Sequence, residues 1–202
     1  MENWLHGWHG RPPFSSINIG GGFVYPEPHA LAMPQAIVRL LQNFPVQVLW
    51  KFRKEAPHSD DFMDGLVPFT NSGRLRVEHW LAAEPLSLME TGNVTISVHH
   101  GGSGEYHEAT SAGILQVILL LWRGLYGFAQ LGESVGVAVC GCREPNPHWT
   151  PDRLYLDIVR AVQGSESFAL QEKSRKLGLR LQQNPGRYIA AQEIEKLAGS
   201  GV

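Results

Sequence analysis

A histidine pair followed by a glycine-rich turn is the stretch of this 202-residue chain with the clearest chemical potential. Residues 99–105 read His-His-Gly-Gly-Ser-Gly-Glu and lie between the apolar run 93–98 and a helix-like run that ends at Gly113. Unpaired N–H groups and the dipole at a helix start attract anions, and glycine lets an anion approach the backbone. The pattern therefore favours a turn that holds the phosphates of a nucleotide. The alternative is a tight strand-to-helix turn whose histidines are ordinary surface residues.

Apolar strands and amphipathic helices alternate on both sides of this turn. The hydrophobic patterns predict six strands, at 14–19, 46–52, 74–80, 94–98, 115–122 and 136–140. They predict helices at 28–44, 85–90, 103–112, 125–134, 150–162, 165–183 and 187–197, and a loop at 54–73. Pro34 lies inside the first of these segments, so that helix either begins at Pro34 or kinks there. Such alternation indicates an α/β protein with a parallel sheet and right-handed crossovers.

Three turns with a composition suited to ligands are expected at one edge of this sheet. Parallel sheets bind ligands beyond the carboxyl ends of their strands. Residues 99–105, the triple glycine 20–22 and residues 122–124 all follow such ends. This convergence strengthens the nucleotide hypothesis, while a merely flexible turn stays the alternative for residues 20–22.

Composition and charge exclude several classes of protein. With 43% hydrophobic and 18% charged residues, the chain can bury a core and is not expected to be disordered. A net charge of −2 shows no basic excess, so nucleic acid is not an expected partner. We expect no membrane span, because no apolar run reaches 18 residues. The first residues lack the pattern of a signal peptide, and we therefore expect a cytoplasmic protein.

Cys140 and Cys142 are separated by one residue, a spacing at which a disulfide is strained. With His148 nearby, a metal site is the alternative reading. A structural zinc site needs four ligands, usually with wider spacing within each pair. We therefore expect small core thiols at a strand end and no metal.

The segment 80–136 carries a further set of residues in a characteristic order. The set comprises Trp80-Leu81, the turn 99–104, Glu108-Ala109, Ala112-Gly113, Gln116-Val117-Ile118 and Phe128-Ala129. It resembles the donor-binding signature of the family-one nucleotide-sugar glycosyltransferases. The likeness is strongest to the branch that glycosylates sterols and antibiotic or other natural-product aglycones, in which the turn reads His-His-Gly-Gly-Ala-Gly-Thr. The expected strands at 14–22 and 46–51 also fit the start of that family's C-terminal domain.

This resemblance implies the C-terminal half of a GT-B fold, with a Rossmann-like six-stranded parallel sheet followed by C-terminal helices. We accordingly expect an interdomain linker or irregular arm at 1–13, a nucleotide-sugar donor-binding domain at 14–163 and a C-terminal helical extension at 164–202. The implied donor substrate is UDP or a UDP-sugar, with no metal or other cofactor.

The resemblance also implies roles for individual residues. Trp80, with its neighbour Leu81, would stack on the uracil, and Glu108 would hold the ribose hydroxyls. His100 would bind the diphosphate, because an imidazole can donate to phosphate oxygens. The glycine-rich residues would share this contact, namely Gly101, Gly102, Ser103 and Gly104, with Gly21 as another point of close approach. The alternatives are a core aromatic for Trp80 and a solvated helix acid for Glu108.

Three positions depart from the family pattern. Glu105 stands where the family has Ser or Thr, and a carboxylate repels phosphate unless it rotates away or is protonated. Gly124 and Leu125 stand where the family has Asp or Glu followed by Gln, which grip the sugar hydroxyls. Neither replacement has a side chain that can bond a sugar.

The family's N-terminal domain carries the acceptor pocket and the histidine that acts as general base, and this sequence begins at the linker. His6 and His9 have no nearby acid to orient them, so no catalytic residue is assigned. We expect the donor-binding half of an enzyme that transfers a hexose to a lipophilic small molecule, inactive as this chain alone. A degenerate nucleotide-binding module and a truncated pseudoenzyme are the alternatives. A separate acceptor-domain chain or a homodimer would cover exposed apolar surface near 1–25 and 99–106.

Overall fold

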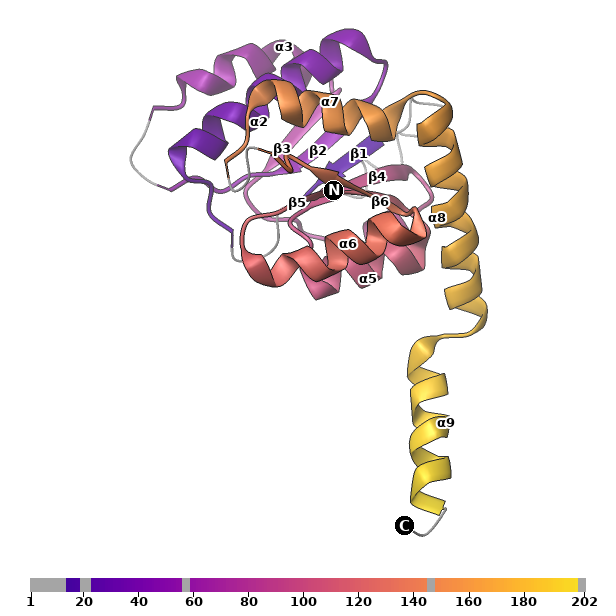
Figure 1. The fold of residues 1–202 in the computed structure, drawn as a ribbon. Helices are drawn as coiled ribbons and strands as arrows, with labels where there is room; N and C mark the ends of the chain where they lie inside the picture. The colour runs from indigo at the N-terminus through magenta and orange to yellow at the C-terminus, as the bar shows by residue number, and fades with distance from the viewer. Residues whose placement is uncertain (1–13, 19–22, 56–58, 145–147, 200–202) are drawn as a thin grey trace.

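The computed structural model describes residues 14–18, 23–55, 59–144 and 148–199, and within them forms one parallel sheet between two layers of helices (Figure 1). The six strands are β1 (Phe14–Ile17), β2 (Gln47–Lys51), β3 (Leu75–Glu78), β4 (Val94–His99), β5 (Leu115–Leu119) and β6 (Ala138–Gly141). Their order across the sheet is β3-β2-β1-β4-β5-β6, and every pairing is parallel. The structure therefore confirms the Rossmann-like α/β fold expected from the sequence.

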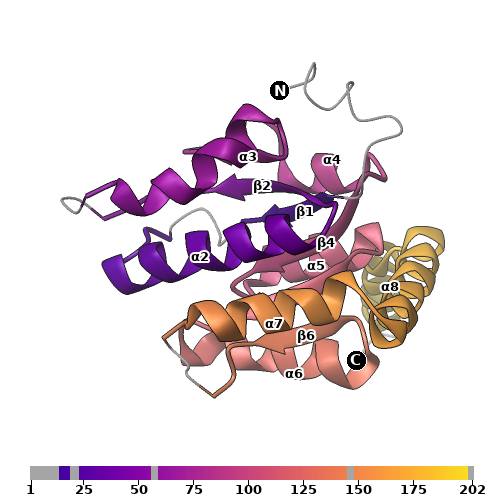
Figure 2. The same cartoon turned by 90° about the horizontal axis from the view of Figure 1, so that it is seen from above.

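Helices cover both faces of the sheet. They are α2 (Glu27–Asn43), α3 (Val67–Asn71), α4 (Pro85–Met89), α5 (Ser103–Ala112), α6 (Tyr126–Val135), α7 (Pro151–Val162), α8 (Ser165–Gln183) and α9 (Gly186–Gly199). Two 3₁₀ turns join them, η1 (Asp61–Leu66) and η2 (Arg123–Leu125). Figures 1 and 2 place α2, α3 and α7 on one face of the sheet and α5 and α6 on the other.

Successive strand residues point to opposite faces, and the core is divided accordingly. Val48 and Trp50 of β2 pack in the cluster that α2 and α7 cover, whereas Leu49 packs with α4 and α5 on the other face. All five residues of β2 are buried, as expected for a parallel strand with helices on both sides.

The strand order reverses between β1 and β4, which lie side by side although 76 residues separate their ends in the sequence, Ile17 and Val94. Helices that start from these two strands leave in opposite directions, so a crevice opens beyond their carboxyl ends. The glycine-rich turn after β4 therefore lies at the topological switch point of the sheet.

The structure corrects three details of the expected elements. The segment 54–73, expected as a loop, contains η1 and α3, because Phe62, Met63 and Phe69 pack on the main core. The fifth strand ends at Leu119, not at residue 122. Helix α2 begins before Pro34 and runs through it.

The last helix, α9, projects away from the rest of the chain and buries none of its residues (Figure 1). The larger apolar side chains that it exposes are Tyr188, Ile189, Ile194 and Leu197. No helix in the described part of the chain has the length and apolar character needed to cross a membrane.

Candidate functional site

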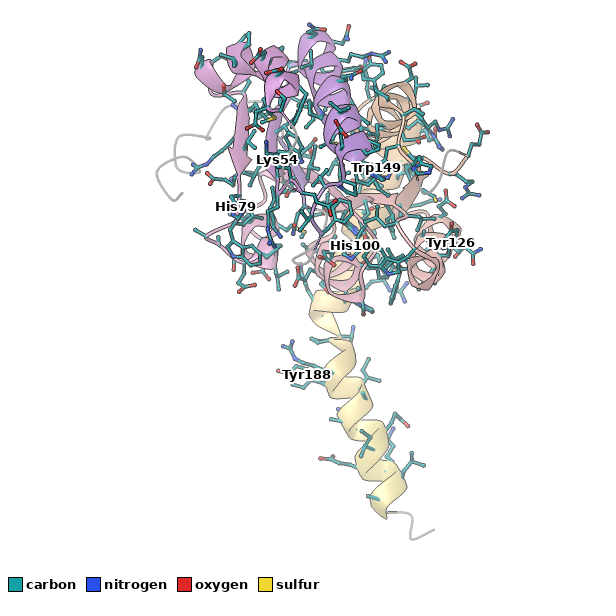
Figure 3. All side chains as sticks on the ribbon, turned by 90° about the vertical axis from the view of Figure 1, so that its left-hand side faces the viewer. Lys54, His79, His100, Tyr126, Trp149 and Tyr188 are labelled. Carbon is teal, nitrogen blue, oxygen red and sulfur yellow. The ribbon has the colours of Figure 1, made fainter. Side chains whose placement is uncertain are left out.

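A cavity of about 360 Å³ lies beyond the carboxyl ends of β1, β2 and β3, against the first turns of α5. Among the described residues its lining comprises Asn18, Lys51, Trp80–Pro85, Gly104, Glu105 and Glu108. The structure thus brings five sequence-predicted residues into one cavity: Trp80, Leu81, Gly104, Glu105 and Glu108. Figure 3 looks onto this edge and labels residues that follow different strands, which are spread across the molecule from His79 and Lys54 through His100 to Trp149 and Tyr126.

Two glycines of the turn serve different purposes. Gly101 has φ +86°, and a Cβ added there would lie 2.7 Å from Cγ2 of Ile118 in β5. Gly101 is therefore required by the backbone conformation and by close packing on the sheet. A Cβ on Gly104 would meet nothing within 4 Å, so this glycine borders open space in the cavity.

The two histidines of the turn lie in different environments. His99 is fully buried: its Nδ1 accepts from the Gly101 N–H at 3.0 Å. Its Nε2–H then donates to the Gln116 carboxamide oxygen at 2.9 Å, and the Gln116 amide donates to Thr110. The surface-residue alternative is therefore wrong for His99. Through these hydrogen bonds His99 connects the turn to Gln116 of β5 and, through Gln116, to Thr110 of α5.

Burial lowers the pKa of His99 to about 4, against an ordinary value near 6.5. Between these two values the unfolded chain binds a proton that the folded chain does not, so stability falls as the pH drops through this window. We expect His99 to contribute a loss of about 2 kcal/mol in the free energy of unfolding from pH 7 to pH 5. Urea unfolding of the wild type and His99→Gln at both pH values measures it, and an identical pH dependence in the two proteins would contradict the assignment.

His100 lies on the other side of the turn, beside Glu105. Its Nδ1 is 4.0 Å from Oε1 of Glu105, and its ring packs on Trp122 with a centroid distance of 5.4 Å. Burial lowers the pKa of His100, the Glu105 charge opposes this shift, and Lys51 adds to it. His100 Nδ1 is buried and has no hydrogen-bond partner among the described residues. This nitrogen lies beside the Glu105 carboxylate, and His100 is not among the described residues that line the cavity. A ligand would reach the imidazole where the Glu105 side chain now lies.

Trp80 and Lys51 stand together at the mouth of the cavity. The Trp80 side chain is 57% exposed, so the core-aromatic alternative is wrong. The Lys51 Nζ lies 4.3 Å from the Trp80 ring centroid, in cation–π contact. The ammonium thus covers one face of the indole ring.

Glu108 is half-buried on α5, one turn beyond Glu105. Its pKa is raised by burial first, and then by the negative charges of Glu105 and Glu84. Glu108 is thus part of the cavity wall, and the description as a solvated helix acid does not fit it.

Sequence reasoning missed Asn18, Lys51 and Glu84 as lining residues. Asn18 and Lys51 stand at the carboxyl ends of β1 and β2, where polar side chains follow buried strands. Asn18 is 8% exposed, and its carboxamide oxygen has no hydrogen-bond partner among the described residues. A polar residue directly after a buried strand was the signal that could have identified both.

Other expected site residues do not line the cavity. Leu125 is buried, and its backbone oxygen would lie 3.5 Å from a Cβ on Gly101, so it supports the turn from within the core. Gly124 is exposed, and Ser103 faces solvent next to His107 on the first turn of α5. Gly21 lies outside the described residues.

The two cysteines are buried on β6 and directly after it. Cys140 packs in an apolar cluster with α6, and the Cys142 N–H donates to the buried Asp157 carboxylate at 2.8 Å. Burial raises the pKa of the Cys142 thiol to about 12. Both residues therefore have the surroundings of core thiols.

Known proteins resemble this chain in both sequence and fold. Glycosyltransferase sdnJ of Sordaria araneosa is 34% identical over 170 residues, which cover 80% of this chain and 33% of that protein. The Glycyrrhiza uralensis protein UGT73P12, solved with glycyrrhetinic acid 3-O-monoglucuronide, superposes with a TM-score of 0.78 at 16% identity, over 98% of this chain and 43% of that structure.

A UDP-glucose:anthocyanidin 3-O-glucosyltransferase in complex with UDP superposes with a TM-score of 0.73 at 16% identity, over 96% of this chain and 42% of that structure. No family model matches the chain. The chain spans about a third of the length of the curated relative at 34% identity.

Proposed function

The chain belongs to the family-one, GT-B glycosyltransferases and corresponds to their C-terminal domain, and we propose that it binds the UDP part of a UDP-sugar donor. The observation that carries this proposal is the cavity at the switch point of the sheet. The wall of this cavity contains an aromatic ring, Trp80, and a carboxylate, Glu108. The first turn of α5 also lines the cavity, and its Gly104 has no side chain to fill the space.

Each part of UDP has a chemical counterpart in this site. The exposed Trp80 ring suits stacking with uracil. The Glu108 carboxylate can accept hydrogen bonds from both ribose hydroxyls. The diphosphate suits the N-terminus of α5 and the unpartnered nitrogen of His100. The Asn18 oxygen offers a further acceptor for an N–H or O–H group of the ligand.

The reaction in which such a half takes part is transfer of a hexose to a lipophilic acceptor. This chain would hold the departing diphosphate, while another domain or chain would supply the acceptor pocket and the general base. The exposed side chains of Trp122 and Tyr126, which follow the carboxyl end of β5, suit contact with such a partner.

A second candidate function is a nucleotide-binding module that transfers no sugar. Gly124 and Leu125 favour it, because neither offers a hydrogen bond to a hexose, and Leu125 is committed to the core. Both candidate functions require the UDP site. They differ in whether the glucose moiety of UDP-glucose increases the binding affinity over that of UDP.

Isothermal titration of the purified chain with UDP and with UDP-glucose tests both candidates. We expect UDP to bind, because the chain carries side chains suited to the base, the ribose and the phosphates. An affinity for UDP-glucose at least about tenfold above that for UDP would indicate an intact sugar site. Equal affinities would favour the module, and no heat of binding for either ligand at about 1 mM would contradict the proposed function.

A further inference from the structure

The end of the cavity at the start of α5, where the diphosphate is proposed to bind, contains a carboxylate of the chain itself, Glu105. Glu105 lies in the first turn of α5, whose N-cap residue, Gly102, provides no side-chain cap. A Cβ on Gly102 would lie 2.5 Å from Oε2 of Glu105 and 2.8 Å from Nε2 of His100. The Glu105 carboxylate and the His100 imidazole therefore both pack against Gly102 of the turn. A carboxylate at this place is stabilised by the same helix dipole that would attract a phosphate.

A cation of the chain lies in the wall of the same cavity, at the end of strand β2. Lys51, at the end of β2, is 6% exposed and lines the same cavity as Glu105. Burial and the nearby Arg53 lower the pKa of Lys51, and the Glu105 charge opposes this shift. A nearby negative charge, whether the Glu105 carboxylate or a phosphate in its place, favours the charged form of this ammonium group.

We propose that Lys51 is a further nucleotide-binding residue, which contacts the phosphates of the donor, and that the Glu105 carboxylate is the anion these phosphates replace. The inference rests on the proposed function, since it concerns the same cavity. The family pattern has a Ser or Thr hydroxyl at position 105, where this chain has Glu. In this chain the ammonium group of Lys51 would make the phosphate contact instead. The ammonium would then contact Trp80 on one side and phosphate on the other.

Titration calorimetry with UDP and uridine separates phosphate contacts from contacts with the base and ribose. Lys51→Met keeps an unbranched side chain of similar length and removes the charge. We expect it to weaken UDP binding about tenfold and uridine binding less than about twofold. Lys51→Arg, which keeps the charge, should stay within about threefold of the wild type for UDP. An equal loss of UDP and uridine affinity in Lys51→Met would overturn the assignment, because Lys51 would then act through Trp80 alone.

Glu105→Gln tests the second half of the proposal and does not depend on the folding of the Lys51 variants. We expect it to strengthen UDP binding about tenfold and to leave uridine binding unchanged, because it removes a competing charge. Glu90→Gln is the matched control: it removes one negative charge from the exposed end of α4, outside the described lining of the cavity. It should change the UDP affinity less than about threefold.

The outcomes distinguish this inference from the proposed function. If the wild type binds UDP but Glu105→Gln leaves its affinity unchanged, Glu105 is not the anion that phosphate replaces, while the proposed function stands. An equal gain for Glu90→Gln and Glu105→Gln would also overturn the inference, because only the net charge of the chain would then matter. If the wild type and all variants bind neither UDP nor uridine, the proposed function fails as well.

Discussion

Gly101→Ala is expected to destabilise the chain by about 2–4 kcal/mol and to abolish UDP binding. The backbone at Gly101 has φ +86°, a conformation that alanine rarely adopts. The added methyl would lie 2.7 Å from Ile118 Cγ2, in the buried centre of β5. Since the Gly101 N–H also bonds to His99, any shift of the turn would disturb the network that holds it on the sheet.

Urea unfolding of the wild type, Gly101→Ala and Gly104→Ala measures this effect. Gly104 is the matched control, because it lies three residues further on in the same stretch and a Cβ there meets nothing within 4 Å. Gly104→Ala should leave stability unchanged or raise it by up to about 1 kcal/mol, since alanine favours a helix. A Gly101→Ala variant as stable as the wild type would contradict the conformational role given to Gly101.

His100→Ala is expected to weaken UDP binding by about 1–3 kcal/mol, without comparable loss of uridine affinity. The His100 ring lies beside Glu105 at the start of α5, and its Nδ1 is buried without a hydrogen-bond partner. An imidazole in this position can donate to a phosphate oxygen, and uridine has no phosphate. Titration calorimetry with the two ligands measures the difference.

His107→Ala is the control for this variant. His107 lies on the same helix but is exposed, and its Nδ1 bonds to the backbone oxygen of Ser103. We expect its removal to leave the affinities for UDP and uridine unchanged. If His107→Ala and His100→Ala weakened UDP binding equally, a contact between His100 and the phosphates would be disproved.

The alternation of strands and helices carried most of the fold prediction. A nearly continuous apolar strand such as β5 is typical of a parallel sheet, and this pattern is visible without coordinates. The segment 54–73 was missed because it is polar and contains proline, whereas Phe62 and Phe69 anchor it to the core. Such long-range packing leaves no periodic signal in so short a stretch.

The site was predicted less completely than the fold. Adjacent histidines have the same chemistry, and the sequence alone does not tell which one turns inward. The structure resolves this point: His99 is a buried support of the turn, and His100 lies beside Glu105. Lys51 and Asn18 were missed because their place in the cavity depends on strand order, which brings the ends of β2 and β1 next to α5.

A crystal structure of the chain grown with UDP would show directly whether this cavity is the nucleotide site. We expect uracil on the exposed Trp80 ring, ribose hydroxyls at the Glu108 carboxylate and phosphates between His100 and Lys51 at the start of α5. We also expect the Glu105 carboxylate to leave its position over Gly102. UDP bound elsewhere on the chain, with this cavity unchanged, would contradict the proposed site.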